Sequence, residues 1–302
     1  MDAWPRLPLA DWEDSCATLH LWTQVVGKIR LAHAPLVNHW WQVVLYVTSR
    51  GLTTSIIPYG SRGFQLDFDF IDHVLVIRTT DGATETIALV SRSVADFHAE
   101  VMGRLRLLGV ETRIWTMPVE IPDAIPFEQD HTHAAYDADA VQRFWRMLVQ
   151  ADRVCKIFRA RFLGKVSPVH FFWGSFDLAV TRFSGRTAPA LTSESPNLGA
   201  WVMQEAYSHE VSSAGFWPGN GGFGEAAFYS YAYPEPPGFA DAPVRPAAAA
   251  YNQELGQFIL PYDAVREAAS PDDCLLDFLQ STYEAAANLA QWDRGALERP
   301  AG

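Results

Sequence analysis

Cysteine is scarce in this chain, which has three cysteines among 302 residues: Cys16, Cys155 and Cys274. They lie far apart without a CxxC spacing, so we expect buried free thiols in a reducing compartment rather than a disulfide framework. No apolar run reaches the ~18 residues that a membrane-spanning helix needs. The first residues also lack the basic and apolar regions of a signal peptide. The sequence therefore predicts a soluble, cytoplasmic protein without a membrane partner.

Positive charge is also scarce, with 23 Lys and Arg against 35 Asp and Glu and a formal net charge of −12. Nucleic acids and anionic membranes require a basic footprint, so neither is an expected partner. The GxxxxGK[ST] motif is absent and no GxGxxG motif opens a βαβ unit, so no nucleotide cofactor is expected. A helical HExxH motif and a GxSxG elbow are absent as well, which excludes the zincin and nucleophile-elbow signatures.

Two segments of similar sequence are present, one in each half of the chain. Residues 35–51 are PLVNHWWQVVLYVTSRG, and residues 168–185 are PVHFFWGSFDLAVTRFSG. Each follows a long helical pattern and combines a proline, a histidine, an aromatic pair and an apolar run that ends in a Thr/Arg/Gly turn. Further strands and a capped helix follow in both halves. We therefore predict an α+β fold, an internally duplicated helix–antiparallel sheet–helix unit whose two halves pack with pseudo-two-fold symmetry.

The boundaries of the two units follow from local signals. Strands are expected over residues 41–49, 52–59, 64–70, 74–79 and 84–90, and helices over 11–32, 93–108 and 137–163. Residues 64–70 show the clearest strand pattern, because apolar and polar side chains alternate. We predict a first unit over residues 1–115, a proline-rich linker over 116–136, and a second unit over 137–302.

The strand predicted over residues 169–183 is almost wholly apolar, yet it contains Asp177. A carboxylate in a buried strand must be paired or hydrogen-bonded, or its pKa rises. Because side chains alternate along a strand, Asp177 shares a face with Trp173, and His170 points to the other face. Asp177 is either a structural acid that binds a helix terminus or an arginine, or a residue of a site. We take His170 and Asp177 as candidate catalytic residues.

A second polar cluster precedes a glycine-rich loop. His209 and Glu210 lie in a strand of small residues predicted over 206–213, and Trp217 begins the loop. If this strand neighbours the one with His170, two imidazoles and two carboxylates converge, which suits general acid/base chemistry or a divalent metal. His170, His209 and Glu210 are the candidate metal ligands, although their spacing is not diagnostic of a metal site.

The first half offers a candidate anion site. The helix face with His20, Gln24 and Lys28 lacks acids, and Asn38 and His39 stand at the start of the next strand. A cation together with amide and imidazole donors suits a carboxylate or a phosphate. The alternative is an ordinary solvated helix face.

Aromatic side chains are abundant, with 11 tryptophans and 13% aromatic residues. Tryptophan buries a large surface and needs a partner for its indole N–H, so we expect several tryptophans at a pocket or an interface. The seam between two packed halves is a favourable place for a ligand pocket. Trp173 and Trp217 are the expected aromatic walls of that pocket.

Five strings carry a resemblance to a known family: GKIRLA (27–32), NHWW (38–41), LYVTSRGLTT (45–54), SPVHFFWGSFDLAVTRFSGR (167–186) and SHEVSSAGFWPG (208–219). With them the chain resembles a bacterial family of uncharacterised proteins, a domain of unknown function, over nearly its whole length. The resemblance implies a soluble bacterial protein and adds weight to the residues inside the strings. It implies no particular activity.

Together these features predict a small-molecule enzyme with an aromatic-lined seam pocket, acting on a compact anionic substrate by acid/base or metal-assisted chemistry. The expected catalytic residues are His170, Asp177, His209 and Glu210, and the expected substrate-binding residues are Lys28, Asn38, His39, Trp173 and Trp217. The same pocket would also serve a non-catalytic ligand-binding or sensor protein. A scaffold that presents exposed tryptophans to a partner is a third interpretation.

Overall fold

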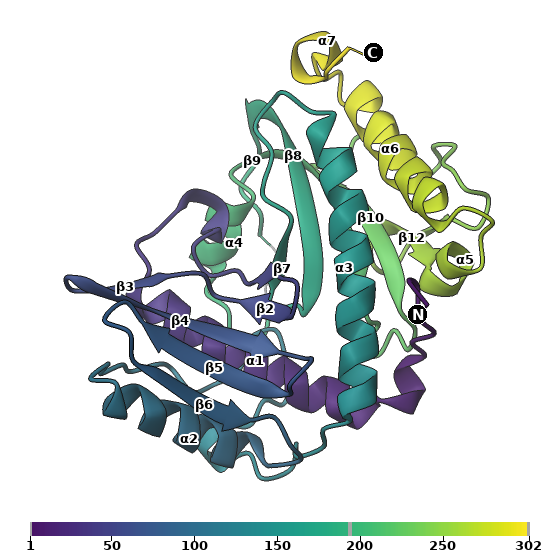
Figure 1. The fold of residues 1–302 in the computed structure, drawn as a ribbon. Coiled ribbons are helices and arrows are strands. Elements are labelled where there is room, and N and C mark those ends of the chain that lie inside the picture. The colour runs from purple at the N-terminus through teal and green to yellow at the C-terminus, as the bar shows by residue number, and fades with distance from the viewer. Residues whose placement is uncertain (1, 193–194, 301–302) are drawn as a thin grey trace.

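Two antiparallel sheets with long helices beside them make up the computed structural model, which describes residues 2–192 and 195–300 (Figure 1). The first half contains α1 (Glu13–His33), α2 (Val94–Leu107), the 3-10 helices η1 (Leu9–Asp11) and η2 (Asn38–Trp40), and the strands β1 (Tyr46–Val47), β2 (Gly51–Thr53), β3 (Ile57–Tyr59), β4 (Arg62–Asp69), β5 (Val74–Thr79) and β6 (Thr84–Ala88). The 3-10 helix η3 (Phe127–Gln129) follows. The second half contains α3 (Ala138–Ala160), α4 (Ala200–Ala206), α5 (Tyr262–Arg266), α6 (Pro271–Leu289), α7 (Arg294–Leu297), and the strands β7 (His170–Phe172), β8 (Asp177–Thr187), β9 (His209–Trp217), β10 (Ala227–Tyr233), β11 (Ala250–Asn252) and β12 (Gln257–Pro261).

Each sheet has six strands, which confirms the predicted α+β class. The first sheet has the order β1-β2-β4-β5-β6, with β3 paired to β4, and the second has the order β11-β12-β10-β9-β8-β7. The two sheets meet at their edges beside β1 and β7. There Leu45 and Phe171 exchange two backbone hydrogen bonds of 2.8 Å in an antiparallel bridge. The repeated sequence segments therefore lie side by side at the junction of the two halves.

The alternation predicted for residues 64–70 is confirmed by β4. Its apolar side chains Phe64, Leu66 and Phe68 are buried, as is Phe70, which directly follows the strand. Helices α1 and α2 pack beside one another along the first sheet (Figure 1). Trp22 of α1 stacks on Phe97 of α2 with ring centroids 4.6 Å apart, and Phe97 in turn stacks on Phe68. One face of this sheet therefore forms the core of the first half.

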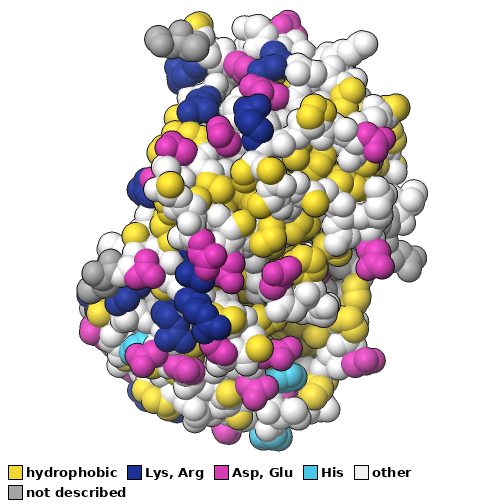
Figure 2. All heavy atoms as spheres, turned by 90° about the vertical axis from the view of Figure 1, so that its right-hand side faces the viewer, with side chains coloured by type: hydrophobic (Ala, Val, Ile, Leu, Met, Phe, Trp, Pro, Cys, Tyr) yellow, Lys and Arg dark blue, Asp and Glu magenta, His cyan; other side chains and the backbone are white. Residues whose placement is uncertain are grey.

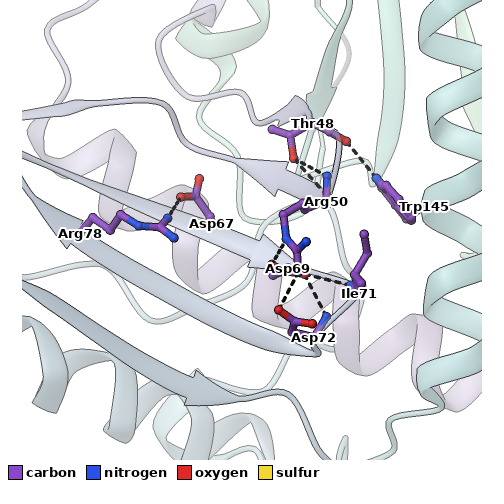
Figure 3. A network of polar contacts seen from close by, with 9 residues as sticks. Thr48, Arg50, Asp67, Asp69, Ile71, Asp72, Arg78 and Trp145 are labelled. Atoms are coloured by element: carbon purple, nitrogen blue, oxygen red, sulfur yellow. Dashed lines mark hydrogen bonds and ion pairs between the residues drawn. The ribbon is translucent and has the colours of Figure 1, made fainter.

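The other face of the first sheet carries a network of ion pairs (Figure 3). Asp67 pairs with Arg78 at 2.7 Å and is partly exposed, as the alternation predicts. Asp69 was expected to face solvent too, but it is buried, because Arg50 covers it and the backbone amides of the following turn donate to its carboxylate. Trp145 of α3 donates to the carbonyl oxygen of Thr48 at 3.1 Å, which ties this edge to the second half.

The second sheet has α3 and α6 on one face. Arg182 of β8 points toward these helices and is fully buried, and its guanidinium lies 3.5 Å from the centroid of the Phe158 ring and 4.2 Å from that of Tyr283. The predicted helix start is confirmed, since the Asp137 side chain accepts a hydrogen bond from the Ala140 amide at 3.0 Å. The opposite face of this sheet is free of long helices and forms the floor of the cavity described below.

Three local predictions need correction. The strand predicted over 169–183 is a hairpin, in which Phe172 pairs with Asp177 across a turn where Phe176 has a φ of 60°. The strand predicted over 41–49 is limited to β1, because residues 41–43 form a turn and bend that follow η2. The strand predicted from residue 206 begins at His209, since α4 occupies the preceding residues.

The segment predicted as a linker, 116–136, packs into the core. Gln24 donates to the carbonyl oxygen of Val119 and accepts from its amide, both at 2.9 Å, and Phe127 is fully buried. Across residues 2–192 and 195–300, no helix is both long and apolar enough to cross a membrane. On the face that carries α5 and α6, acidic and basic side chains are intermixed around a central group of hydrophobic side chains (Figure 2).

Candidate functional site

A cavity of about 950 Å³ lies between the second sheet and the first half. Its floor is built by alternate residues of neighbouring strands, because every second side chain of a strand faces the same side. These residues are Asp177, Ala179, Thr181 and Phe183 of β8, Val211 and Ser213 of β9, and Tyr229 and Tyr231 of β10. The walls come from α1, η2, residues 113–122 and residues 195–207. The cavity thus lies where residues of the two halves meet.

Six tryptophans line this cavity: Trp40, Trp41, Trp115, Trp173, Trp201 and Trp217. The inner two have partners for their indole N–H groups, since Trp173 donates to the Val43 carbonyl oxygen and Trp217 donates to Asn220, both at 2.7 Å. Trp115 and Trp201 are 60% and 61% exposed, which places them at the mouth. The cavity therefore offers flat apolar walls to a ligand.

Asp177 lies on the cavity floor at the start of β8. It is buried, as predicted, but its side-chain partners are the hydroxyl groups of Ser175 and Tyr229 rather than a basic residue. Burial raises the pKa of Asp177, and the two hydroxyl donors oppose that rise. The hairpin turn creates this arrangement, because it places Ser175 next to Asp177 at the end of the strand pair.

Glu120 is the second carboxyl group in the cavity and comes from the predicted linker. Burial, and secondly the charge of Asp177, raise the pKa of Glu120 to about 7. Its side chain packs directly over the hairpin turn, since a β-carbon at Gly174 would lie 2.1 Å from Glu120 Oε1. The backbone amide of Glu120 donates to the Pro196 carbonyl oxygen at 2.8 Å, which anchors the residue. Two carboxyl groups with raised pKa values therefore face one cavity.

Hydroxyl groups cover the floor beside the two acids. The hydroxyls of Tyr207 and Tyr231 are 2.7 Å apart, and those of Thr181 and Ser213 are 2.8 Å apart. Burial raises the pKa values of Tyr207, Tyr229 and Tyr231. These phenols therefore stay neutral at physiological pH and act as hydrogen-bond donors and acceptors.

Lys28 of α1 supplies a cation to the cavity wall. Its ammonium group donates to the Met117 carbonyl oxygen at 2.6 Å and lies 4.8 Å from the centroid of the Trp115 ring. Burial lowers the pKa of Lys28 to about 8. Arg113 lines the cavity as well. Lys28 therefore keeps donor capacity that an anionic group of a ligand would use.

His20 holds the hairpin turn in place from α1. It stacks on Phe176 with ring centroids 4.8 Å apart, and its Nε2–H donates to the Gly174 carbonyl oxygen at 2.8 Å. Burial lowers the pKa of His20 to about 4, so the ring is neutral at physiological pH. His20 therefore positions the turn that carries Ser175 and supports Glu120.

His39 lines the cavity, whereas Asn38 is exposed and does not. His39 Nδ1–H donates to the Ala206 carbonyl oxygen at 2.9 Å, and the Lys165 ammonium group donates to Nε2 at 2.7 Å. Burial is the main cause that lowers the pKa of His39, and the charge of Lys165 adds to it. Both ring nitrogens are occupied within the protein.

The structure does not bring His170, His209 and Glu210 into the cavity. His170 is fully buried beneath Trp41 and Phe172, and burial followed by the charges of two nearby arginines lowers its pKa to about 3. The His209 ring packs against His39 with centroids 5.7 Å apart. Glu210 points to the opposite face of β9 from Val211 and pairs with Arg186 at 2.6 Å beside a separate hollow of about 270 Å³. Among the described residues, no three His, Cys, Asp or Glu side chains form a metal-binding group.

Four functional candidates were missed in the sequence: Glu120, Tyr207, Tyr229 and Tyr231. The spacing of Tyr229 and Tyr231 was an available signal, because two tyrosines at period two share a face when their segment forms a strand. Glu120 had no such signal, since it lies in an irregular segment whose position depends on long-range contacts.

These features define an α+β protein in which the second sheet, α1 and irregular segments of both halves line a tryptophan-rich cavity that two carboxyl groups face. The chain belongs to a family of unknown function (DUF5996), which matches it over residues 4–299. The resemblance noted in the sequence is therefore confirmed. No curated protein and no solved structure matches the chain.

Proposed function

We propose that the protein is a small-molecule enzyme that performs general acid/base chemistry in the seam cavity, on a compact substrate with an anionic group. The observation that carries this proposal is Glu120, a carboxyl group whose pKa is raised to about 7 and which lines the cavity beside Asp177. A group whose pKa lies near the working pH both accepts and returns protons efficiently. Strongly perturbed carboxyl groups in a cleft are typical of catalytic sites.

The contacts of each group support a separate role. Glu120 moves the proton, because no hydrogen bond to its carboxyl group occurs among the described residues and the group is available to a substrate. Asp177 is held by two hydroxyl groups and keeps the pKa of Glu120 high through its charge. Lys28 holds the anionic group, and the tryptophan walls exclude water from the reacting atoms.

The internal duplication is part of the same proposal. The first strand of each unit lies at the junction of the two sheets, and the backbones pair in the antiparallel direction at Leu45 and Phe171. A pseudo-two-fold axis between the units would produce this pairing. The same axis would explain the order of the strands. In both sheets the strands lie in chain order when counted outward from the junction, and the exceptions are β3 and β11.

Cellular context and metal dependence are separate parts of the proposal. A bacterial, cytoplasmic location fits the family resemblance and the three free thiols. Metal assistance at the carboxyl groups is an additional proposal, and elemental analysis of the purified protein tests it.

The enzyme proposal is tested with small-molecule extracts and mass spectrometry. Wild type is expected to consume at least one compound, and Glu120→Gln to bind that compound but convert it at least ~100-fold more slowly, the lower range for one acid/base group. Glu128→Gln is the matched control, because Glu128 is exposed on the same segment and does not line the cavity. Conversion by Glu120→Gln at the wild-type rate would refute the assigned role. Release of an unaltered ligand by wild type would favour the binding or sensor protein.

A further inference from the structure

The two carboxyl groups on the cavity floor lack a positive partner. Asp177 is bonded by the neutral hydroxyls of Ser175 and Tyr229, and the charge that acts on Glu120 is the like charge of Asp177. No Lys, Arg or His of the described residues forms an ion pair with either group, although the same residues contain sixteen ion pairs elsewhere. Buried carboxylates are normally paired, so this end of the cavity is incomplete without a cation.

The surroundings of the pair suit an organic cation. Aromatic rings around the acids come from Trp173, Tyr207, Tyr229 and Trp217, all of which line the cavity. The faces of such rings attract cations, most strongly where water is excluded. A protonated amine would gain both the carboxylates and the ring faces, whereas the further oxygen ligands for a bare metal ion would be neutral hydroxyl groups.

The same cavity also carries positive charge, from Lys28 and Arg113. Residues 117–120 run along α1, because Met117 bonds Lys28 and Val119 bonds Gln24. Three residues of extended chain then separate the Lys28 contact from Glu120, which corresponds to a backbone span of at most ~10 Å. A compact molecule can therefore reach Lys28 and the carboxyl pair at the same time.

We infer that the ligand of this cavity is zwitterionic, with a protonated amine at Glu120 and Asp177 and an anionic group at Lys28, joined by an aromatic or aliphatic spacer. This inference rests on the proposed function only in that both use the same cavity. It adds the amine, which the acid/base role of Glu120 does not require.

Isothermal titration calorimetry on the full chain tests the inference with four matched probes. They are 4-(aminomethyl)benzoate, which has both charges, 4-(hydroxymethyl)benzoate, which replaces the ammonium by a neutral hydroxyl, benzylamine, and benzoate. The zwitterion is expected to bind at least about tenfold more tightly than the hydroxymethyl analogue, a difference of ~1.4 kcal/mol. Equal or tighter binding of the hydroxymethyl analogue would overturn the inference and point to a hydroxylic ligand.

Variants assign the preference to particular residues. Glu120→Gln and Asp177→Asn should each reduce the preference for the amine over the hydroxyl, and Lys28→Met should weaken benzoate while sparing benzylamine. Glu128→Gln should leave all four affinities unchanged. An amine preference that survives both carboxyl substitutions would refute the assignment.

The two proposals fail separately. Amine-selective binding without any turnover would leave the inference standing and refute the enzyme, whereas turnover of a substrate without an amine would do the reverse.

Discussion

Substitution of Gly27 tests the close packing of α1 against Trp173, a residue of the cavity. A β-carbon at Gly27 would lie 2.2 Å from the indole ring of Trp173, which lines the cavity and donates a hydrogen bond to Val43. Gly103 of α2 is the matched control, because its β-carbon would meet only the end of the Arg106 side chain, at 3.8 Å. Both glycines lie inside helices, so substitution by alanine increases the helix propensity equally at either position.

The two substitutions should change stability in opposite directions. Alanine favours a helix over glycine by about 1 kcal/mol, so Gly103→Ala should raise the free energy of unfolding by up to that amount. At Gly27 the same gain is opposed by ~1–3 kcal/mol of overpacking and by ~1 kcal/mol for the displaced indole hydrogen bond. Gly27→Ala should therefore lower the free energy of unfolding by about 1–3 kcal/mol.

Urea denaturation followed by circular dichroism measures both changes, and equal slopes of the transitions ensure that the midpoints are comparable. Gly27→Ala should also shift the tryptophan fluorescence of the folded protein, because Trp173 must move. A Gly27→Ala protein as stable as Gly103→Ala would refute the packing of Trp173 against α1.

Three further predictions concern buried polar groups. Asp177→Ala should lower the free energy of unfolding by ~1–3 kcal/mol in urea denaturation, because it leaves hydroxyl donors unpaired, whereas Asp67→Ala should change it little, because its ion pair with Arg78 is near the surface. Equal effects would contradict the predicted difference in burial. The folded pKa of His170, about 3, lies below its unfolded value near 6.5. Protonation therefore favours unfolding, stability falls as pH drops below 6.5, and His170→Leu should lose less stability than wild type between pH 7 and pH 5, as measured by denaturation at each pH. Gln24→Leu should destabilise by ~2–4 kcal/mol in thermal or urea unfolding, since both backbone groups of Val119 lose their partner; a loss below 1 kcal/mol would contradict this.

Elements with strong local signals were predictable from the sequence. The alternation in residues 64–70 placed the apolar side chains of β4 in the core, and Asp137 marked the start of α3. These signals depend on side-chain periodicity and capping, which act between residues close in the chain.

The turn at residues 173–176 was not predictable in the same way. The apolar run over residues 169–183 by itself predicts one long strand. Contacts of Gly174 with Glu120 and His20, both distant in sequence, hold the turn in the folded protein. Secondary-structure propensity depends on residues near in sequence and therefore does not predict such long-range contacts.

The sequence by itself determined the α+β class, the positions of most helices and strands, and the cavity residues Lys28, His39, Trp173, Asp177 and Trp217. Only the tertiary structure decided which polar side chains share the cavity. It replaced His170, His209 and Glu210 with Glu120 and a group of tyrosines. The physical reason is that a side chain's burial, partners and pKa depend on neighbours from distant segments, and that strand pairing and the hairpin turn decide which face each residue presents.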